Sequence, residues 1–546
     1  MSIPDYVQLF RRRRSSLLLR DGGPGPTIAT TWGLAFDRLR ARSPLAATVL
    51  ETMAFLAPDA VDVAVLAPLA PDELDLHDAI GELLRLSLID REGSQLRMHG
   101  LVQDVVRDRL PVQARRDRFL AAAGLCDAPS RGGDAGAAAW AAHLVALAEH
   151  GERQGVVPDR LVESLSALAR RYAARALYPA ATQVLDAALR LIRVPVDTRS
   201  AGDREMLEGR LVCQLGEVYD AAGRLPEALQ LHRDAVRMLQ AVVGPDDVAL
   251  AHAHNRLGHV LNCNDEIEDA IIEHERALAV LARAGRDDLR PPVLSDLGYS
   301  LWAAGRLEPA GAALQASRAA LAAQGRRDDR DWAHATAGLG MVEQDRGELA
   351  AAVAHQRTVI EVFTRACGPD HPDTAQALDK LGYVLRLRGQ LAESMASGER
   401  AVRLLERVLG TDDSRVGMAL TNLGLAYKDA GQLEPALRSQ SRARMIFQAR
   451  LGPAHAHTLL ASRRLAVVLA ESGHPMRAMG LVEEVLSTTA SRGDDNGAEH
   501  GRIAADVATV HAAIGDTAMA AQWWATARAE LTRALGADHP EVLALP

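Results

Sequence analysis

Histidines are the residues of this sequence whose type and spacing could do chemistry. His252, His254 and His259 lie close together and could suggest a metal site. Residues two apart on a helix do not face the same side, so His252 and His254 have poor ligand geometry. The sequence also contains no GxSxG, HExxH or catalytic-cysteine signature. It therefore predicts neither a metal site nor an enzyme.

The sequence has no phosphate-binding loop of the Walker A type. Such a loop requires GxxxxGK[ST], because its lysine reaches the terminal phosphates of the nucleotide. The chain has only two lysines, Lys380 and Lys428, and neither of them follows a glycine. No cofactor is therefore expected. ADP or ATP could act here only if a separate or missing NTPase core were supplied to bind it.

The composition is that of an acidic, helix-rich chain of several structural units. It has 546 residues, a net charge of −9 and 3% aromatic residues, so alanine and leucine fill most of the core. A general nucleic-acid binder would usually be basic. The four cysteines are too scattered for a disulfide framework. No apolar run reaches the roughly 18 residues that suggest a membrane span, so we expect a cytoplasmic protein.

The dominant feature is an internal repeat. A Leu-Gly pair or its equivalent recurs at a spacing of 42 residues, except once at 40. Its first residue falls at 215, 257, 297, 339, 381, 423, 465 and 507. Each copy supports two antiparallel helices. In one copy, Leu423 and Tyr427 lie within about one helical turn, a turn follows at Gly431, and Ala436 lies on the next helix.

Small residues at one fixed position indicate close packing of these helices. Helix pairs stack tightly only if their crossing points hold no bulk. The crossing position is occupied by Ala181, Ala228, Ala270, Ala310, Ala352, Ser394, Ala436, Ala478 and Ala520. Glycine, which tolerates the left-handed backbone that closes a helix, marks the turn in most copies. The sequence therefore predicts a mainly all-α chain built around a solenoid of about nine helix pairs.

The repeat resembles the tetratricopeptide repeat, in the 42-residue variant seen in kinesin light chains and bacterial signalling ATPases. The strings between copies agree, among them CGPDHPDT at 367–374 and LGPAHAHT at 451–458. Gly-Pro-Asp ends one helix, and Asp or Thr can cap the next. The resemblance covers roughly residues 159–546. It implies a right-handed superhelix whose concave groove binds a protein or peptide ligand.

Three positions on each first helix define a candidate binding surface. They lie two before, two after and five after the Leu-Gly leucine, and this i, i+4, i+7 spacing puts them on one face. In tetratricopeptide arrays that face lines the groove. The polar and aromatic residues at these positions, here called the first-helix row, are Asn255, His259, Asn262, Tyr299, Trp302, Gln344, Tyr383, Arg386 and Lys428. Tyr, Trp and Arg dominate interface energetics, which favours protein binding here.

The upstream segment, residues 26–112, resembles the winged-helix domain that follows the ATPase core in STAND proteins of the NB-ARC type. Its pattern is a series of helices, a short hairpin and a final helix. The marks of the resemblance are Thr31-Trp32-x-Leu34-x-Phe36, Phe55-Leu56-Ala57-Pro58 and Met98-His99-Gly100-Leu101-Val102-Gln103.

The resemblance implies a role for His99. In the family, the histidine of a Met-His-Asp motif touches the β-phosphate of bound ADP and locks the resting state. Gly100 departs from the pattern, because the family often has aspartate there. The alternative is that His99 ends a hairpin strand and makes only local hydrogen bonds.

Two further segments complete the predicted organisation. Residues 1–25 look like a remnant helix of the small helical domain that precedes the winged helix, so we expect the chain to begin partway through a larger design. Residues 113–158 are expected to form a helical connector, with a loop over 130–138.

We therefore expect the sensor and regulatory part of a STAND-type signalling system, without catalysis in this chain. A possible NTPase core and a protein or peptide ligand are the expected partners. Two alternatives remain open: a free-standing tetratricopeptide scaffold, or a winged-helix transcription regulator. DNA binding is not favoured, since the candidate reading helix carries Asp78 and Glu82 against a single Arg85.

Overall fold

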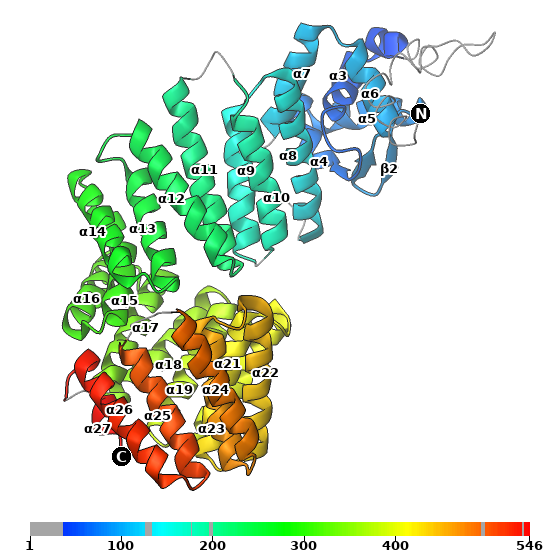
Figure 1. Ribbon diagram of the computed structural model, residues 1–546. Coiled ribbons are helices and arrows are strands. Elements are labelled where there is room, and N and C mark those ends of the chain that lie inside the picture. Colours follow the sequence, from blue (N-terminus) through cyan, green and yellow to red (C-terminus); the bar gives the residue numbers. More distant parts are fainter. Residues whose placement is uncertain (1–35, 126–133, 176, 196–199, 493–496, 538–539) are drawn as a thin grey trace. The chain divides into compact units, whose positions relative to one another are not determined.

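The chain is described from a computed structural model, which is built mainly of helices (Figure 1). The prediction of an all-α solenoid is confirmed. None of the described helices combines the length and apolar character that crossing a membrane requires. The chain divides into two compact units, residues 1–244 and 245–546. The described residues are 36–125, 134–175, 177–195, 200–492, 497–537 and 540–546.

The first unit begins with a module of helices around a small sheet. Residues 36–42 are helical and precede α3 (Pro44–Met53). The antiparallel sheet has the strand order β1-β3-β2. The predicted hairpin is present, and Gly93 takes a left-handed φ of 62° at its turn. The further elements are β1 (Val61–Asp62), α4 (Val63–Leu66), η1 (Ala67–Leu69), α5 (Glu73–Arg85), β2 (Asp90–Glu92), β3 (Gln95–Arg97) and α6 (Gly100–Arg109).

The predicted connector packs onto this module. It forms α7 (Val112–Gly124) and α8 (Asp134–Gln154), so the part of the predicted loop from residue 134 onward is helical. The Phe119 ring packs edge-on against Phe55 at a centroid distance of 6.1 Å. His143 accepts a hydrogen bond from the Ala57 amide at 3.1 Å. These contacts tie the connector to the core of the module. The segment predicted as a remnant helix, residues 1–25, lies outside the described residues.

Repeated helix pairs make up the rest of the chain. Among the described residues nine pairs run from α9 to α26, two in the first unit and seven in the second. The pairs are α9 (Asp159–Ala173) with α10 (Tyr178–Ile192), α11 (Ala201–Ala221) with α12 (Leu225–Val242), α13 (Val248–Cys263) with α14 (Ile267–Arg283), α15 (Arg290–Ala303) with α16 (Leu307–Ala323), α17 (Arg330–Asp345) with α18 (Leu349–Ala366), α19 (Pro372–Leu387) with α20 (Leu391–Leu409), α21 (Ser414–Asp429) with α22 (Leu433–Leu451), α23 (Ala456–Glu471) with α24 (Pro475–Arg492), and α25 (Gly497–Ala513) with α26 (Thr517–Leu535).

The Leu-Gly glycine is required because the second helix of the same pair comes very close to it. A Cβ on Gly258 would lie 2.7 Å from the His274 ring, and one on Gly424 would lie 2.5 Å from the Gln440 amide nitrogen. The predicted small residues are equally enclosed, since Ala270 and Ala436 are fully buried. Small residues therefore recur in the repeat because the two helices of each pair approach closely at two positions, the glycine and the crossing residue.

Candidate functional site

The residues of the first-helix row lie on the first helices of successive pairs in the second unit. Asn255, His259 and Asn262 lie on α13, Tyr299 and Trp302 on α15, Gln344 on α17, Tyr383 and Arg386 on α19, and Lys428 on α21. All of them except Asn255 are half-buried. Side chains of that kind are held in place by the protein and still reach solvent, as a binding surface requires.

Asn255 is placed differently from the rest of the row. Its side chain is only 3% exposed. Its amide nitrogen donates to Asp296 at 2.8 Å, and its amide oxygen lies 2.9 Å from His274 Nδ1. Asn255 thus joins α13 to its own second helix and to the next pair. It is a packing residue rather than a ligand contact.

Trp302 and Gln344 come together through an acid that the sequence analysis did not single out. Trp302 Nε1 donates to one carboxylate oxygen of Asp345 at 2.7 Å, and Gln344 Nε2 donates to the other at 3.2 Å. Asp345 lies six residues after its Leu-Gly leucine. Asp429 and Glu471 occupy the same position in later copies, and aligning the copies would have revealed them.

A second group links Tyr383, Arg386 and Lys428. The Arg386 guanidinium lies 5.0 Å from the centre of the Tyr383 ring and pairs with Asp429 at 2.7 Å. Lys428 Nζ lies 3.3 Å from the other oxygen of Asp429 and 3.8 Å from Glu471. Both cations therefore have acidic partners, and the group connects α19, α21 and α23.

Tyr299 is the centre of a third group. Its hydroxyl donates to the backbone oxygen of His334 at 2.9 Å, and the two rings lie 4.7 Å apart. Lys380 Nζ lies 5.6 Å from the same tyrosine ring and 3.5 Å from the Met341 sulfur. This group spans α15, α17 and α19. Neither His334 nor Lys380 belongs to the positions that the sequence analysis selected.

Burial controls the charges around this third group. It lowers the pKa of His334 to about 4, so the imidazole is neutral at pH 7. It also raises the pKa of Asp379 to about 6, although Asn422 donates to both carboxylate oxygens. Burial would raise the pKa of Asp296 as well, but the Arg256 guanidinium and nearby histidines outweigh it and lower that pKa.

His99 caps a helix. Its Nδ1 accepts a hydrogen bond from the Leu101 amide at 3.2 Å and so caps the N-terminus of α6. His371 and His455 cap α19 and α23 in the same way. The local hydrogen bonding of the alternative interpretation is therefore present. An acceptor role for Nδ1 places the proton on Nε2, and the side chain is exposed.

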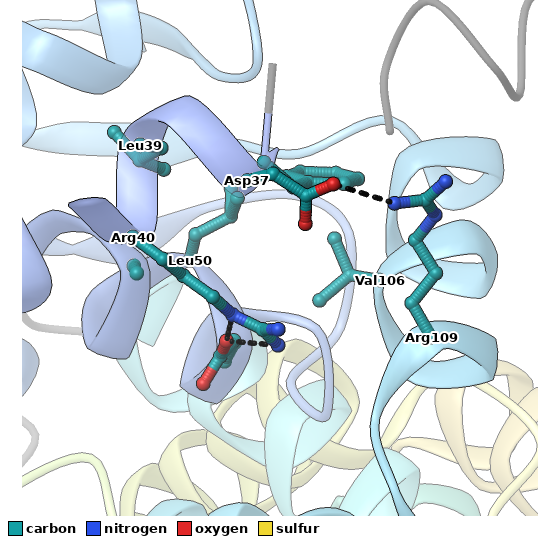
Figure 2. A pocket seen from close by; sticks show the side chains of 9 residues that line it. Asp37, Leu39, Arg40, Leu50, Val106 and Arg109 are labelled. Carbon is teal, nitrogen blue, oxygen red and sulfur yellow. Dashed lines mark hydrogen bonds and ion pairs between the residues drawn. The ribbon is translucent and has the colours of Figure 1, made fainter. Parts of the chain in front are cut away.

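Two hollows lie in the first unit. One is lined by residues 87–90 together with His99, Leu101 and Val102. The other is a cleft of about 110 Å³ with an apolar floor that includes Leu50 and Val106 (Figure 2). Its rim carries two ion pairs, Asp37 with Arg109 at 3.8 Å and Arg40 with Glu51. None of the candidate binding or nucleotide-sensing residues lines this second cleft, but Phe36, one of the marks of the winged-helix resemblance, does.

The histidines considered as metal ligands are separated in the structure. His252 is exposed whereas His254 is buried against Glu273, as the helical spacing predicted. Potential ligand atoms of Cys367, His371 and Asp373 do lie within 4.8 Å of one another. However, His371 is engaged as a helix cap and Asp373 pairs with Arg330 at 2.7 Å.

Two protein-family models match this chain, one in the repeats and one in the upstream module. The model of the tetratricopeptide repeat matches residues 209–283, 332–407 and 379–449. These segments are tetratricopeptide repeats. They contain the whole first-helix row except Tyr299 and Trp302, which lie on α15 between two matched segments. A second model, described as a domain of unknown function (DUF7779), matches residues 35–115.

Solved structures show the same kind of fold. A STAND protein with a tetratricopeptide repeat sensor from Pyrococcus horikoshii is 11% identical, with a TM-score of 0.55 over 97% of this chain and 72% of that chain. A Rap protein complexed with competence and sporulation factor is 10% identical, with a TM-score of 0.52 over 69% and 99% of the two chains. At such identities the likeness concerns the fold alone. A comparison with curated proteins found no significant match.

Proposed function

We propose that this tetratricopeptide chain binds a peptide or protein segment along the first-helix row. In this proposal it is the cytoplasmic sensor and regulatory part of a STAND-type signalling system. The observation that carries the binding role is the arrangement of Tyr299 and Trp302 on α15 and of Tyr383 and Arg386 on α19, with Gln344 on α17 between them. Each is half-buried, and the polar atoms of Trp302 and Arg386 are fixed by acids of the following pair. Such pre-organised aromatic and arginine side chains lose little entropy when a ligand binds.

The fold likenesses support the sensor role. One of the similar structures is a STAND protein whose tetratricopeptide repeats are described as its sensor. Another is a Rap protein in complex with a signalling factor. We infer that the repeats of this chain have the same class of task, the detection of a protein or peptide.

The upstream module supports the STAND assignment. Three helical segments, α3, α4 and α5, precede a hairpin, and β1 completes the sheet in the order β1-β3-β2. This order of elements supports the winged-helix interpretation that we propose. His99 lies two residues after β3, and no described residue accepts from its Nε2–H once Nδ1 is used as the cap. A phosphate of ADP or ATP, held by an NTPase core, is the acceptor that we propose.

The binding role is tested by selecting peptides on the full chain from a displayed random dodecapeptide library. The selected peptides are then measured against a variant carrying Tyr299→Ser, Trp302→Gln, Tyr383→Ser and Arg386→Gln. Glutamine keeps an N–H donor for Asp345 and Asp429, which protects the fold. We expect affinity to fall at least tenfold, because aromatic and arginine anchors carry most interface energy.

The matched control changes residues of a second helix, Arg438→Gln with Met445→Gln on α22, and should bind as the wild type does. Circular dichroism compares the helix content of all three proteins. Unchanged affinity of every selected peptide for the fourfold variant would show that the first-helix row is not the binding surface.

The STAND role is tested on the native gene product from the source cells. Its mass, bound nucleotide and accompanying polypeptides are measured. We expect a polypeptide with a GxxxxGK[ST] loop, either continuous with this chain or bound to it, together with ADP or ATP. A native product of 58.5 kDa with neither P-loop nor nucleotide would contradict the STAND role and favour the scaffold alternative.

A further inference from the structure

Lys380 differs from Arg386 and Lys428, the arginine and lysine of the first-helix row, because it lacks an acidic partner in the described part of the chain. The chain has two lysines. Lys428 has Asp429 and Glu471 as acidic partners. Within the described residues, Lys380 forms no ion pair and donates to no oxygen. Its nearest contacts are the Met341 sulfur at 3.5 Å and the Tyr299 ring at 5.6 Å from Nζ.

The acids near Lys380 and the neighbouring His334 are already engaged by other donors. Asp296 accepts from Asn255 and Arg256, at 2.8 and 2.9 Å. Asp379, the preceding residue of α19, accepts from Asn422 at 2.9 and 3.1 Å. Asp379 and Lys380 attract each other, but burial still raises the pKa of the acid and lowers that of the lysine. The attraction between the two therefore does not offset the cost of burying them.

The surroundings of Lys380 form a small site with a second donor. One side of the His334 imidazole packs against the Tyr299 ring at 4.7 Å, and the rest of the residue stays accessible to solvent. Burial among neighbouring groups keeps this imidazole neutral at pH 7, so one ring nitrogen carries a proton and can donate. No described residue accepts a hydrogen bond from that ring. The half-buried Tyr299 ring lies near both donors, with its centre 4.7 Å from that of the His334 ring and 5.6 Å from Lys380 Nζ.

We propose that Lys380 and His334 bind a carboxylate of the peptide ligand, with the Tyr299 ring as the adjoining wall. A carboxylate has two oxygens, so it can accept from the ammonium and from the imidazole N–H together. It would also supply the counter-charge that Lys380 lacks within the protein. The carboxylate can come from an Asp or Glu side chain or from the C-terminus of the peptide. This inference rests on the proposed function, because it names the chemistry of the same surface.

The test uses peptides selected on the wild-type full chain and remade in three forms. The first keeps its Asp and Glu residues and has an amidated C-terminus. The second has every Asp and Glu changed to its amide but a free C-terminus. The third has both changes and no carboxylate at all. We expect the third form to bind at least about tenfold more weakly than the form that keeps the contacting carboxylate, since hydrogen bonds to charged groups are strong. The first two forms distinguish the two sources.

Variants assign the effect to Lys380. Lys380→Met should lower affinity for the carboxylate peptide about tenfold, to the level of the third form, and leave the third form unaffected. Lys380→Arg keeps the charge and should restore part of the binding. Arg438→Met, which removes an exposed positive charge from α22, is the charge-matched control and should change affinity less than twofold.

The two lysines also allow a direct readout. Reductive ¹³C-methylation gives one signal for each lysine, and the signal lost in Lys380→Met is that of Lys380. We expect the carboxylate peptide to shift this signal and the third form to leave it in place. Equal binding of all three peptide forms to the wild type would overturn the carboxylate inference and leave peptide binding intact. Failure of any peptide to bind the wild type would overturn both.

Discussion

Trp302 Nε1 donates a 2.7 Å hydrogen bond to Asp345 Oδ2, and this bond joins the first helices of two neighbouring repeats. Arg386 and Asp429 repeat the relationship two pairs later, again across 43 residues. The same side chains that face the proposed ligand therefore also hold adjacent repeats together. In a solenoid, where each repeat contacts only its neighbours, such links contribute directly to the coupling between repeats.

Trp302→Phe is expected to weaken that coupling. Phenylalanine keeps most of the packing but removes the indole donor, so Asp345 loses one of its partners. We expect the free energy of unfolding to fall by about 1.5–3 kcal/mol, the value of one hydrogen bond to a charged group. Urea denaturation gives the free energy, and hydrogen exchange should localise the loss to α15 and α17.

Trp523→Phe provides the control for this change. Trp523 packs against the hydrophobic cluster of the last repeats, and its indole forms no hydrogen bond within the described chain. The same substitution there should alter the free energy of unfolding by packing alone. If both variants lose equal stability, the Trp302–Asp345 bond does not couple the repeats.

Glu51→Ala is expected to destabilise the first module strongly. Glu51 is 7% exposed, and its carboxylate accepts from Arg40 Nε at 2.9 Å and Arg118 Nε at 2.8 Å (Figure 2 shows the Arg40 contact). Removing it leaves two guanidinium groups facing each other over a buried position. Because both arginines are partly solvated, we expect a loss of about 2–3 kcal/mol, below the value for a fully buried pair. Thermal denaturation measures it, with the exposed Glu149→Ala on α8 as a control that changes little.

The extent to which sequence alone predicted this protein depends on the kind of contact involved. The phase of the repeats was predictable because the positions of Gly258 and Ala270 are fixed by contacts within one helix pair, and these recur in every copy. The burial of Asn255 was not predictable from helical periodicity, which identifies a face but not the neighbouring pair that covers it. Lys380 was missed for the related reason that its position is set by Tyr299 and Met341 of the two preceding pairs.

His99→Ala is expected to destabilise α6. The substitution removes the side chain that accepts from the Leu101 amide, and loss of an N-cap costs about 1 kcal/mol. His99→Asn replaces the histidine with a preferred N-cap residue and should restore the stability. Hydrogen exchange of the first α6 amides, with urea denaturation, checks both variants. Equal protection of those amides in wild type and His99→Ala would rule out the capping role.

The same pair of variants separates capping from nucleotide sensing. Asparagine can cap the helix, but it does not carry the imidazole Nε2–H that we propose for a phosphate. In the native system, His99→Asn should therefore keep its stability and lose the dependence of the signalling state on bound ADP. A variant that keeps both properties would show that His99 acts only as a cap.

His274 makes the stability of the second unit depend on pH. Burial lowers the pKa of His274 to about 4 from the ordinary value of 6.5. Between these two values the unfolded chain binds a proton that the folded chain does not. Stability from this residue is therefore complete above about pH 6.5 and declines as the pH falls toward 4. Integrated over that range, the loss is at most about 3 kcal/mol.

His274→Gln should remove that part of the pH dependence without disturbing the packing. Gln356 and Gln440 already occupy the equivalent position, where they lie against Gly340 and Gly424 as His274 lies against Gly258. The reciprocal change, Gln356→His, places an imidazole in the same kind of buried position and should steepen the dependence. Urea denaturation of the three proteins at pH 7.5 and 5 gives the comparison. The free energy of unfolding could change by the same amount between pH 7.5 and pH 5 in all three proteins. That result would mean that the buried imidazole is not the group that titrates, because only the buried imidazole differs among them.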